Sequence, residues 1–290
     1  MKKSRKLATL GICSALFLGL AACQQQHATS EGTNQRQSSS AKVPWKPSYT
    51  NLNNQVSTEE VKSLLSAHLD PNSVDAFFNL VNDYNTIVGS TGLSGDFTSF
   101  THTEYDVEKI SHLWNQKKGD FVGTNCRINS YCLLKNSVTI PKLEKNDQLL
   151  FLDNDAIDKG KVFDSQDKEE FDILFSRVPT EATTDVKVHA EKMETFFSQF
   201  QFNEKARMLS VVLHDNLDGE YLFVGHVGVL VPADDGFLFV EKLTFEEPYQ
   251  AIKFASKEDC YKYLGTKYAD YTGEGLAKPF IMDNDKWVKL

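Results

Sequence analysis

Cys126 stands where the sequence predicts the start of a helix. It follows Thr124 and Asn125, two residue types that favour helix N-termini. At such a position the helix dipole favours the thiolate, and free backbone N–H groups can receive an oxyanion. Asn125 could support that oxyanion or cap the helix. A nucleophile, a buried thiol and half of a disulfide all remain open for Cys126.

Two polar residues interrupt a segment that is otherwise apolar on both faces. The segment GHVGVLVPADDGFLFVEKL, residues 225–243, predicts a β-hairpin with its tip at ADDG, and its polar exceptions are His226 and Glu241. An even-numbered loop would pair 226 with 243 and 228 with 241, which makes His226 and Glu241 diagonal neighbours on one face. Buried polar side chains need partners. The two could satisfy each other, or they could be the base and orienter for a Cys126 nucleophile.

The N-terminus has the features of an export signal. Residues 1–23 pass from a basic region through the apolar stretch Leu7 to Leu20 and end at LAAC, with small residues before Cys23. That stretch is too short and too interrupted for a membrane-spanning helix. LAAC resembles the lipobox of bacterial lipoproteins. The resemblance implies that Cys23 is lipidated as the first mature residue and anchors an extracytoplasmic protein to the cell membrane; an ordinary signal peptide is the alternative.

The segment after the signal predicts a flexible tether. Residues 24–43 lack large apolar side chains and cannot bury enough surface to fold. Hydrophobic periodicity begins near residue 44, so we expect a single α+β domain over 44–290.

Charge and motifs exclude several classes of function. The chain has 31 basic and 40 acidic residues, and loss of the four basic residues of the signal leaves a net charge of about −13. This charge argues against nucleic acid as a partner and against the body of the protein lying on an anionic membrane. No motif for a nucleotide cofactor occurs, and His68, His102 and His112 lack a second ligand at metal spacing. We therefore expect a monomer without a metal or cofactor.

The acidic run DNDAIDKG at 153–160 is expected to be a solvated turn.

Hydrophobic periodicity divides the domain into a helical part and a strand part. The predicted helices lie at 57–69, 71–89, 107–116, from Asn125 or Cys126 onward, 167–178 and 185–200. The first is expected to open with a capping box from Ser57 to Glu60. The predicted strands lie at 207–215, 220–231, 236–245 and 250–255. This order favours an α+β fold, with N-terminal helices packed on one face of a C-terminal antiparallel sheet.

The mature chain keeps an odd number of cysteines. With Cys13 in the signal and Cys23 assigned to the lipid, Cys126, Cys132 and Cys260 remain, so at least one is free or pairs between chains. Cys126 and Cys132 are six residues apart on one predicted helix and point to different sides. Cys132 and Cys260 lie in amphipathic helical patterns and are expected to be buried structural thiols.

A cysteine at a helix start, followed much later by a strand histidine in HVGV, resembles the papain-like superfamily and its NlpC-type cell-wall peptidases and amidases. The resemblance implies a papain-like layout with Cys126, His226 and Glu241 as the catalytic set. TNCRIN lacks the usual Asp-Cys dipeptide, and the hundred residues between Cys126 and His226 exceed the compact NlpC spacing. The whole domain also resembles an uncharacterised domain family of bacterial lipoproteins, on NCR, HVGVL, FVEKL and EEPYQAIKF.

Two functions follow as expectations. The first is a membrane-anchored cysteine hydrolase of amide bonds in peptidoglycan peptides. The second is a non-catalytic surface lipoprotein that binds a peptide, a glycan or a partner protein. In the second, Cys126 is a small buried hydrophobe and His226 is a core histidine paired with Glu241.

Overall fold

The computed structural model describes residues 46–100 and 104–290. Contacts divide the chain into Met1–Val43 and Pro44–Leu290, and the described residues all belong to the second unit. The predicted signal peptide, the predicted lipidation site at Cys23, the predicted tether and His102 lie outside the described residues.

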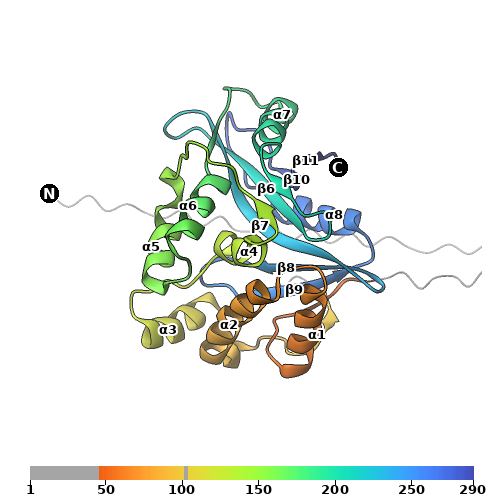
Figure 1. Ribbon diagram of the computed structural model, residues 1–290. Helices are drawn as coiled ribbons and strands as arrows, with labels where there is room; N and C mark the ends of the chain where they lie inside the picture. The colour runs from red at the N-terminus through yellow and green to blue at the C-terminus, as the bar shows by residue number, and fades with distance from the viewer. Residues whose placement is uncertain (1–45, 101–103) are drawn as a thin grey trace, which may run out of the picture. The chain divides into compact units, whose positions relative to one another are not determined.

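Helices dominate the first half of the described chain (Figure 1). The α-helices of the whole described chain are α1 (Gln55–Ser66), α2 (Pro71–Val88), α3 (Val107–Lys118), α4 (Cys126–Leu134), α5 (Phe151–Gly160), α6 (Ser165–Leu174), α7 (Val186–Phe197) and α8 (Lys257–Lys267). Two 3₁₀ turns lie at Gly89–Thr91 and Gln148–Leu150. Over residues 46–100 and 104–290, none of these helices has the length and hydrophobicity to cross a bilayer.

The strands form one large antiparallel sheet and a short ribbon. The large sheet runs in the order β11 (Lys286–Val288), β10 (Phe280–Asp283), β6 (Arg207–Asp215), β7 (Tyr221–Ala233), β8 (Gly236–Lys242), β9 (Tyr249–Phe254), β1 (Ser48–Thr50) and β2 (Thr98–Ser99), with β4 (Val178–Pro179) beside β7. The ribbon pairs β3 (Val138–Thr139) with β5 (Gln201–Phe202). The predicted α+β class with an antiparallel sheet is confirmed. The sheet is not wholly C-terminal, because β1 and β2 extend its β9 edge.

Side-chain caps set where most helices begin. Asn, Asp or Ser at the N-cap accepts a hydrogen bond from the first turn of every α-helix except α5. The predicted capping box at Ser57 is wrong, because α1 begins two residues earlier and Asn54 Oδ1 accepts from the Ser57 N–H at 2.9 Å. Ser57 is itself buried inside the first turn.

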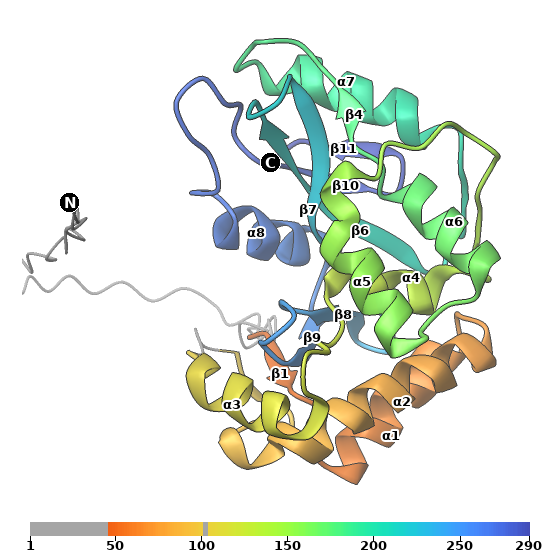
Figure 2. The ribbon, with the colours of Figure 1, turned by 90° about the vertical axis from the view of Figure 1, so that its left-hand side faces the viewer.

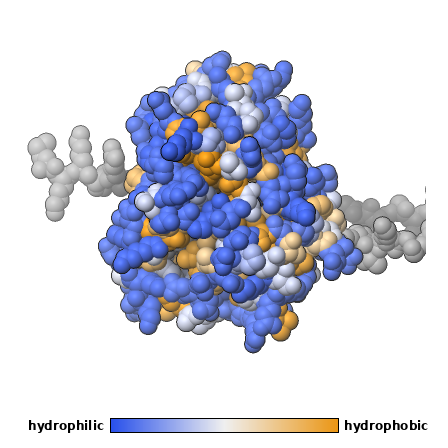
Figure 3. Space-filling view, in the orientation of Figure 1, coloured by the Kyte–Doolittle hydropathy of each residue, from blue (hydrophilic) through white to orange (hydrophobic). Residues whose placement is uncertain are grey.

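The large sheet is covered on both faces, whereas the sequence predicted helices on one face. Figure 2 shows α4 on one side of β7 and α8 on the other. Val227, Val229 and Val231 of β7 join the larger core with α1, α2 and α4. Leu230 and residues of β6, β8 and β9 pack with Cys260 and Leu264 of α8 in a second core. The chain turns back after β9 as α8, so part of the second face is also buried. Seen from outside, the face in Figure 3 is mainly hydrophilic with scattered apolar patches.

The hairpin β7–β8 has the register that the sequence predicted. Val229 pairs with Val240 and Ala233 with Gly236, so the loop contains two residues rather than four but the offset is unchanged. On its β8 side, β7 pairs with β4 at Tyr221 and Leu222 and with β8 only from Val229 onward. Residues 223–228 of that edge therefore have no neighbouring strand.

Gly228 sits at the beginning of the paired part of this hairpin. A Cβ atom here would lie 2.3 Å from Phe239 Cζ and 2.8 Å from the Val240 carbonyl oxygen. We therefore expect Gly228→Ala to lower the free energy of unfolding by about 1–3 kcal/mol, because backbone as well as a ring must move. Urea denaturation measures this change.

Gly273→Ala is the matched control, because the nearest atom to its added Cβ would be Leu276 Cδ1 at 3.5 Å. That variant should unfold within about 0.5 kcal/mol of the wild type. Equal stability of the two variants would contradict the close approach of β8 to Gly228.

Candidate active site

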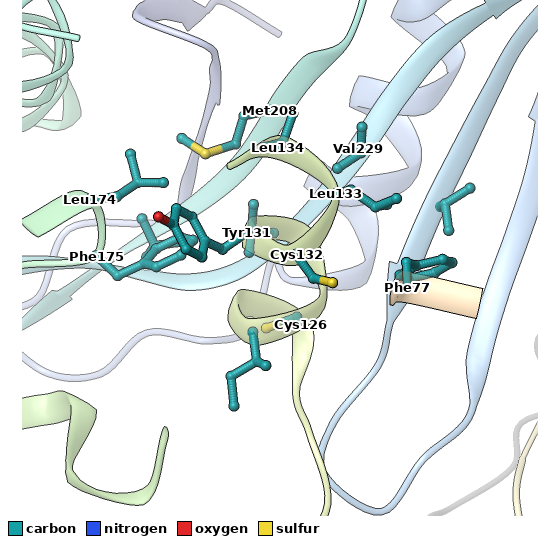
Figure 4. Close-up of a cluster of buried hydrophobic side chains, with 14 of the residues drawn as sticks. Phe77, Cys126, Tyr131, Cys132, Leu133, Leu134, Leu174, Phe175, Met208 and Val229 are labelled. Carbon is teal, nitrogen blue, oxygen red and sulfur yellow. The ribbon is translucent and has the colours of Figure 1, made fainter. Parts of the chain in front are cut away.

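Cys126 is the first residue of α4. The Asn125 side chain caps the helix, with Oδ1 accepting from the Ile128 N–H at 3.1 Å. The N–H groups of Cys126 and Arg127 have no acceptor within the helix, as in the first turn of any α-helix. Figure 4 shows Cys126 at the beginning of this helix among apolar side chains, and the residue is only 5 % exposed.

The strand edge that lacks a neighbour is where α4 meets β7. Arg127 Nη1 donates to the Val224 carbonyl at 3.0 Å, and Ser130 Oγ donates to the Val227 carbonyl at 3.2 Å. The Val227 N–H donates to the Cys126 thiol. Side chains of the first turns of α4 therefore take the place of a neighbouring strand, which brings Cys126 to the residue beside His226.

The structure brings Cys126, His226 and Glu241 into one line of contacts. His226 Nε2 lies 2.5 Å from Glu241 Oε2, and His226 is close enough to Cys126 for its charge and hydrogen bonding to lower the pKa of the thiol. Because the carboxylate occupies Nε2, Nδ1 is the ring nitrogen left for the thiol. His226 is 2 % exposed and Glu241 is 1 % exposed.

Burial and charge act in opposite directions on these three groups. Burial alone would raise the pKa of the Cys126 thiol, but the imidazolium of His226 and its hydrogen bond bring that pKa below the ordinary value. Burial likewise opposes a charged His226, yet the Cys126 thiolate and the Glu241 carboxylate raise its pKa to about 9. Against its own burial, Glu241 has a pKa lowered to about 2 by Lys267 and His226. The direction of each shift favours the charged thiolate–imidazolium pair over the neutral thiol and imidazole.

A cleft of about 890 Å³ opens on the α8 side of the sheet and reaches His226. Six aromatic residues line it: Phe100, Tyr105, Phe254, Tyr263, Tyr268 and Tyr271. Tyr268 stacks on the His226 ring with the ring centroids 4.9 Å apart and the planes 23° apart. Cys126 does not line the cleft, so the imidazole and Tyr268 lie between the cleft and the thiol.

Asn125 is fixed by a buried ion pair. Its Nδ2 donates to Asp153 Oδ1 at 2.7 Å, and Asp153 also receives Arg127 Nε at 2.9 Å and Nη2 at 2.7 Å. Capping is therefore the role that the contacts give Asn125, and an oxyanion would be left to the backbone N–H groups. The predicted solvated turn at 153–160 is wrong, because these residues belong to α5 and Asp153 is fully buried.

Sequence reasoning missed Lys242, which follows Glu241 on β8 and is 1 % exposed. Its Nζ donates to the carbonyls of Thr244 at 2.8 Å, Phe245 at 3.2 Å and Glu247, and lies 4.1 Å from the centre of the Tyr84 ring. Burial lowers the pKa of Lys242 to about 7. The signal was present in the sequence, since consecutive residues of a strand buried on both faces cannot both reach water.

The other cysteines and histidines do not join this site. Cys132 and Cys260 are free and buried, and burial raises the pKa of Cys132 to about 12 and that of Cys260 well above its ordinary value. Figure 4 shows Cys132 further along the same helix as Cys126. His68 Nε2 lies 3.1 Å from the Pro232 carbonyl. In the described part of the chain, no group of three or more His, Cys, Asp or Glu side chains could hold a metal ion.

Burial disfavours the charge of Lys242, but loss of this side chain should still lower stability, because it leaves three backbone carbonyls of the loop after β8 without their donor. We expect Lys242→Met to lower the free energy of unfolding by at least about 2 kcal/mol. Urea denaturation at pH 6, where the ammonium is charged, measures the effect.

Lys253→Met on the neighbouring strand β9 is the control. Lys253 pairs with Glu60 at the surface, with 31 % of its side chain exposed, and should contribute about 1 kcal/mol or less. A Lys242→Met protein as stable as wild type would show that apolar burial replaces the ammonium without cost.

No curated protein and no solved structure matches the chain. Residues 48–288 match a family described as a domain of unknown function, DUF4300. The match takes in the helices, the large sheet and Cys126, His226 and Glu241. Because it covers most of the sequence, the protein belongs to the DUF4300 family.

Proposed function

We propose that the protein is a papain-like cysteine hydrolase that cleaves amide bonds in cell-wall peptides, anchored to the outer face of the membrane through Cys23. The observation that carries this proposal is the line of contacts from Cys126 through His226 to Glu241. Acyl transfer by cysteine enzymes uses three groups in this order. A thiol at a helix N-terminus is the nucleophile, an imidazole next to the thiol is the base, and a carboxylate bonded to the other side of the imidazole orients it.

Each group has a defined step in the proposed reaction. The Cys126 thiolate attacks the carbonyl carbon, and the oxyanion accepts hydrogen bonds from free N–H groups at the start of α4. The C–N bond then breaks as His226 gives its Nδ1 proton to the leaving amine, which leaves a thioester on Cys126. A water molecule, deprotonated by His226, attacks the thioester and releases the acid. The proton taken from this water stays on the imidazole, and breaking of the C–S bond restores the thiolate–imidazolium pair.

The cleft supports a peptide as the substrate. Its volume of about 890 Å³ lies in the range of ligand pockets, and its aromatic walls offer apolar surface while tyrosine hydroxyls, Gln250 and Lys262 offer polar contacts. The order of a helix-start cysteine, a strand histidine and a carboxylate on the next strand supports a papain-like layout. Arg127 follows the cysteine, and Asn125 rather than Asp precedes it, so the family resemblance is carried by placement and not by these neighbours.

One observation favours the second function, a binding lipoprotein without catalysis. Cys126 is only 5 % exposed and does not line the cleft, so a ligand could occupy the cleft without meeting the thiol. In that case the His226–Glu241 pair would serve the core alone. The reactivity of Cys126 separates the two functions even before a substrate is known.

Iodoacetamide should alkylate Cys126 in the folded protein before Cys132 and Cys260. Because the pKa of Cys126 is lowered by His226, its rate should hold as the pH falls below about 7, whereas an ordinary thiol loses its rate below about 8.5. His226→Ala should slow alkylation at pH 6.5 by about tenfold or more. Glu241→Gln should slow it less, because the imidazole remains. Peptide mass spectrometry identifies the alkylated residue.

Cys132 and Cys260 provide internal controls, because burial raises the pKa of both thiols. Cys126→Ala should also abolish the release of new amines from purified peptidoglycan fragments. Slow alkylation of all three thiols, or an unchanged rate in His226→Ala, would remove the basis for hydrolysis and favour the binding function.

The anchoring proposal rests on the LAAC motif and has its own test. Cys23→Ala should move the mature protein from the membrane fraction to the soluble fraction, because the lipid attachment site is lost. Cell fractionation followed by mass spectrometry of the mature N-terminus measures this. An unmodified Cys23 in the wild-type protein would show that the motif is not a lipobox.

A further inference from the structure

Both oxygens of the Glu241 carboxylate have hydrogen-bond partners. While Oε2 contacts His226, Oε1 accepts a hydrogen bond from the Tyr263 hydroxyl and lies 3.4 Å from Lys267 Nζ. Lys267 Nζ also donates to the Tyr263 oxygen at 2.8 Å. Since an ammonium can only donate, the Tyr263 hydrogen is free to point to Glu241, and the hydrogen bonds run from Lys267 through Tyr263 to Glu241.

The geometry of α8 makes this arrangement local and rigid. Tyr263 and Lys267 are four residues apart on the helix and therefore share one face, which lies over the end of β8 that carries Glu241. Tyr268, the next residue, stacks on His226. One turn of α8 thus contacts both the carboxylate and the imidazole.

Charge balance gives Lys267 a role beyond packing. The thiolate of Cys126, the imidazolium of His226 and the carboxylate of Glu241 sum to one negative charge, and Lys267 brings the sum to zero. Burial penalises net charge, and the Glu241 side chain has no exposure at all, whereas Lys267 keeps 30 % of its side chain exposed in the cleft. Lys267 therefore reaches the buried site from its solvent side.

Two other cations lie near the site on elements packed against it. Arg127 on α4 is paired with Asp153 on α5, and Lys242 on β8 donates all three of its N–H bonds to backbone carbonyls and interacts electrostatically with Glu246, Glu247 and the Cys126 thiolate. Among the described residues, neither cation forms an ion pair with Glu241. Cys260 on α8 and the tyrosines that face Glu241 have pKa values raised by burial, so they are uncharged near neutral pH. Glu247 and Asp259 line the cleft, and each adds negative rather than positive charge.

We propose that Lys267, acting through Tyr263 and the Glu241 carboxylate, is a positioning residue that holds the Cys126–His226 pair in its charged, reactive form. This inference rests on the proposed cysteine chemistry. Lys267 does not touch the reacting sulfur. It acts by keeping Glu241 ionised and directed at His226 Nε2.

The pH dependence of Cys126 alkylation by iodoacetamide tests this role in the full chain. Removing a positive charge raises the pKa of every acid near it, so Lys267→Met should shift the acidic midpoint of the rate profile up by about one pH unit. At a pH below both midpoints this shift is a loss of about tenfold in rate. Lys267→Arg keeps the charge and should restore most of the wild-type profile.

Two further variants separate positioning from packing. Tyr263→Phe should shift the midpoint in the same direction by less, because Lys267 keeps only its longer contact with Glu241. Lys257→Met removes a lysine at the other end of the same helix that neither lines the cleft nor forms an ion pair with Glu241, so its profile should match wild type. Thermal unfolding of each variant shows whether the fold is kept.

The outcomes distinguish this inference from the proposed function. If wild-type Cys126 reacts with a lowered midpoint and Lys267→Met keeps that midpoint, the positioning role is wrong while cysteine chemistry stands. A uniform loss of rate at all pH values with an unchanged midpoint would likewise show a structural role only. An ordinary free-thiol profile in the wild type would overturn the proposed function itself.

Discussion

Charged groups can be buried in this site only because each faces an opposite charge. His226 and Glu241 are almost completely buried, and a single unpaired charge buried on either residue would lower the stability of the fold by several kcal/mol. The cost of burying both is offset by the 2.5 Å contact between them and by Lys267 and Tyr263 on the far side of the carboxylate. The positions of α4, β7, β8 and α8 all serve this neutralisation. Cys126, His226 and Glu241 come from α4, β7 and β8, and α8 contributes both Tyr263 and Lys267.

The gap in the edge of β7 makes the arrangement possible. A strand that paired with β8 along its whole length would separate the two faces of the sheet, and a helix on one face could not reach a side chain on the other. Here the β8-side edge of residues 223–228 bonds to α4 through the Val224 and Val227 carbonyls, and Gly225 forms the bulge where β7 shifts its register against β6. Cys126 therefore approaches from the larger core while His226 lies toward α8. A bulge next to an active site commonly redirects a side chain in this way.

Local sequence signals predicted those parts of the structure that depend on local forces. The strand at 207–215 has the predicted limits, and the register of the β7–β8 hairpin follows from its tight polar loop. The 19 residues of the predicted hairpin were therefore enough to predict the diagonal placement of His226 and Glu241. The residue types around Cys126 were enough to predict that it stands at the start of a helix. The side to which α8 folds, the short strands β1 and β2 and the pairing of Asp153 with Arg127 depend on contacts between distant segments. Periodicity within a segment carries no information about such contacts.

Comparison of the three thiols separates the effect of burial on a thiol pKa from the effect of charged and hydrogen-bonding partners. Cys126, Cys132 and Cys260 are all at least 95 % buried, and by desolvation alone each would be an inert neutral thiol. Burial does have that result for Cys132 and Cys260, which have apolar neighbours. Cys126 differs by the imidazole of His226, the guanidinium of Arg127 and the backbone N–H of Val227, and these reverse the direction of its pKa shift. Apolar residues of similar volume in place of the buried charges would be neutral or stabilising for the fold. Stability therefore gives no reason for a charged cluster at this point, whereas a nucleophile that must be ionised before its substrate arrives requires one.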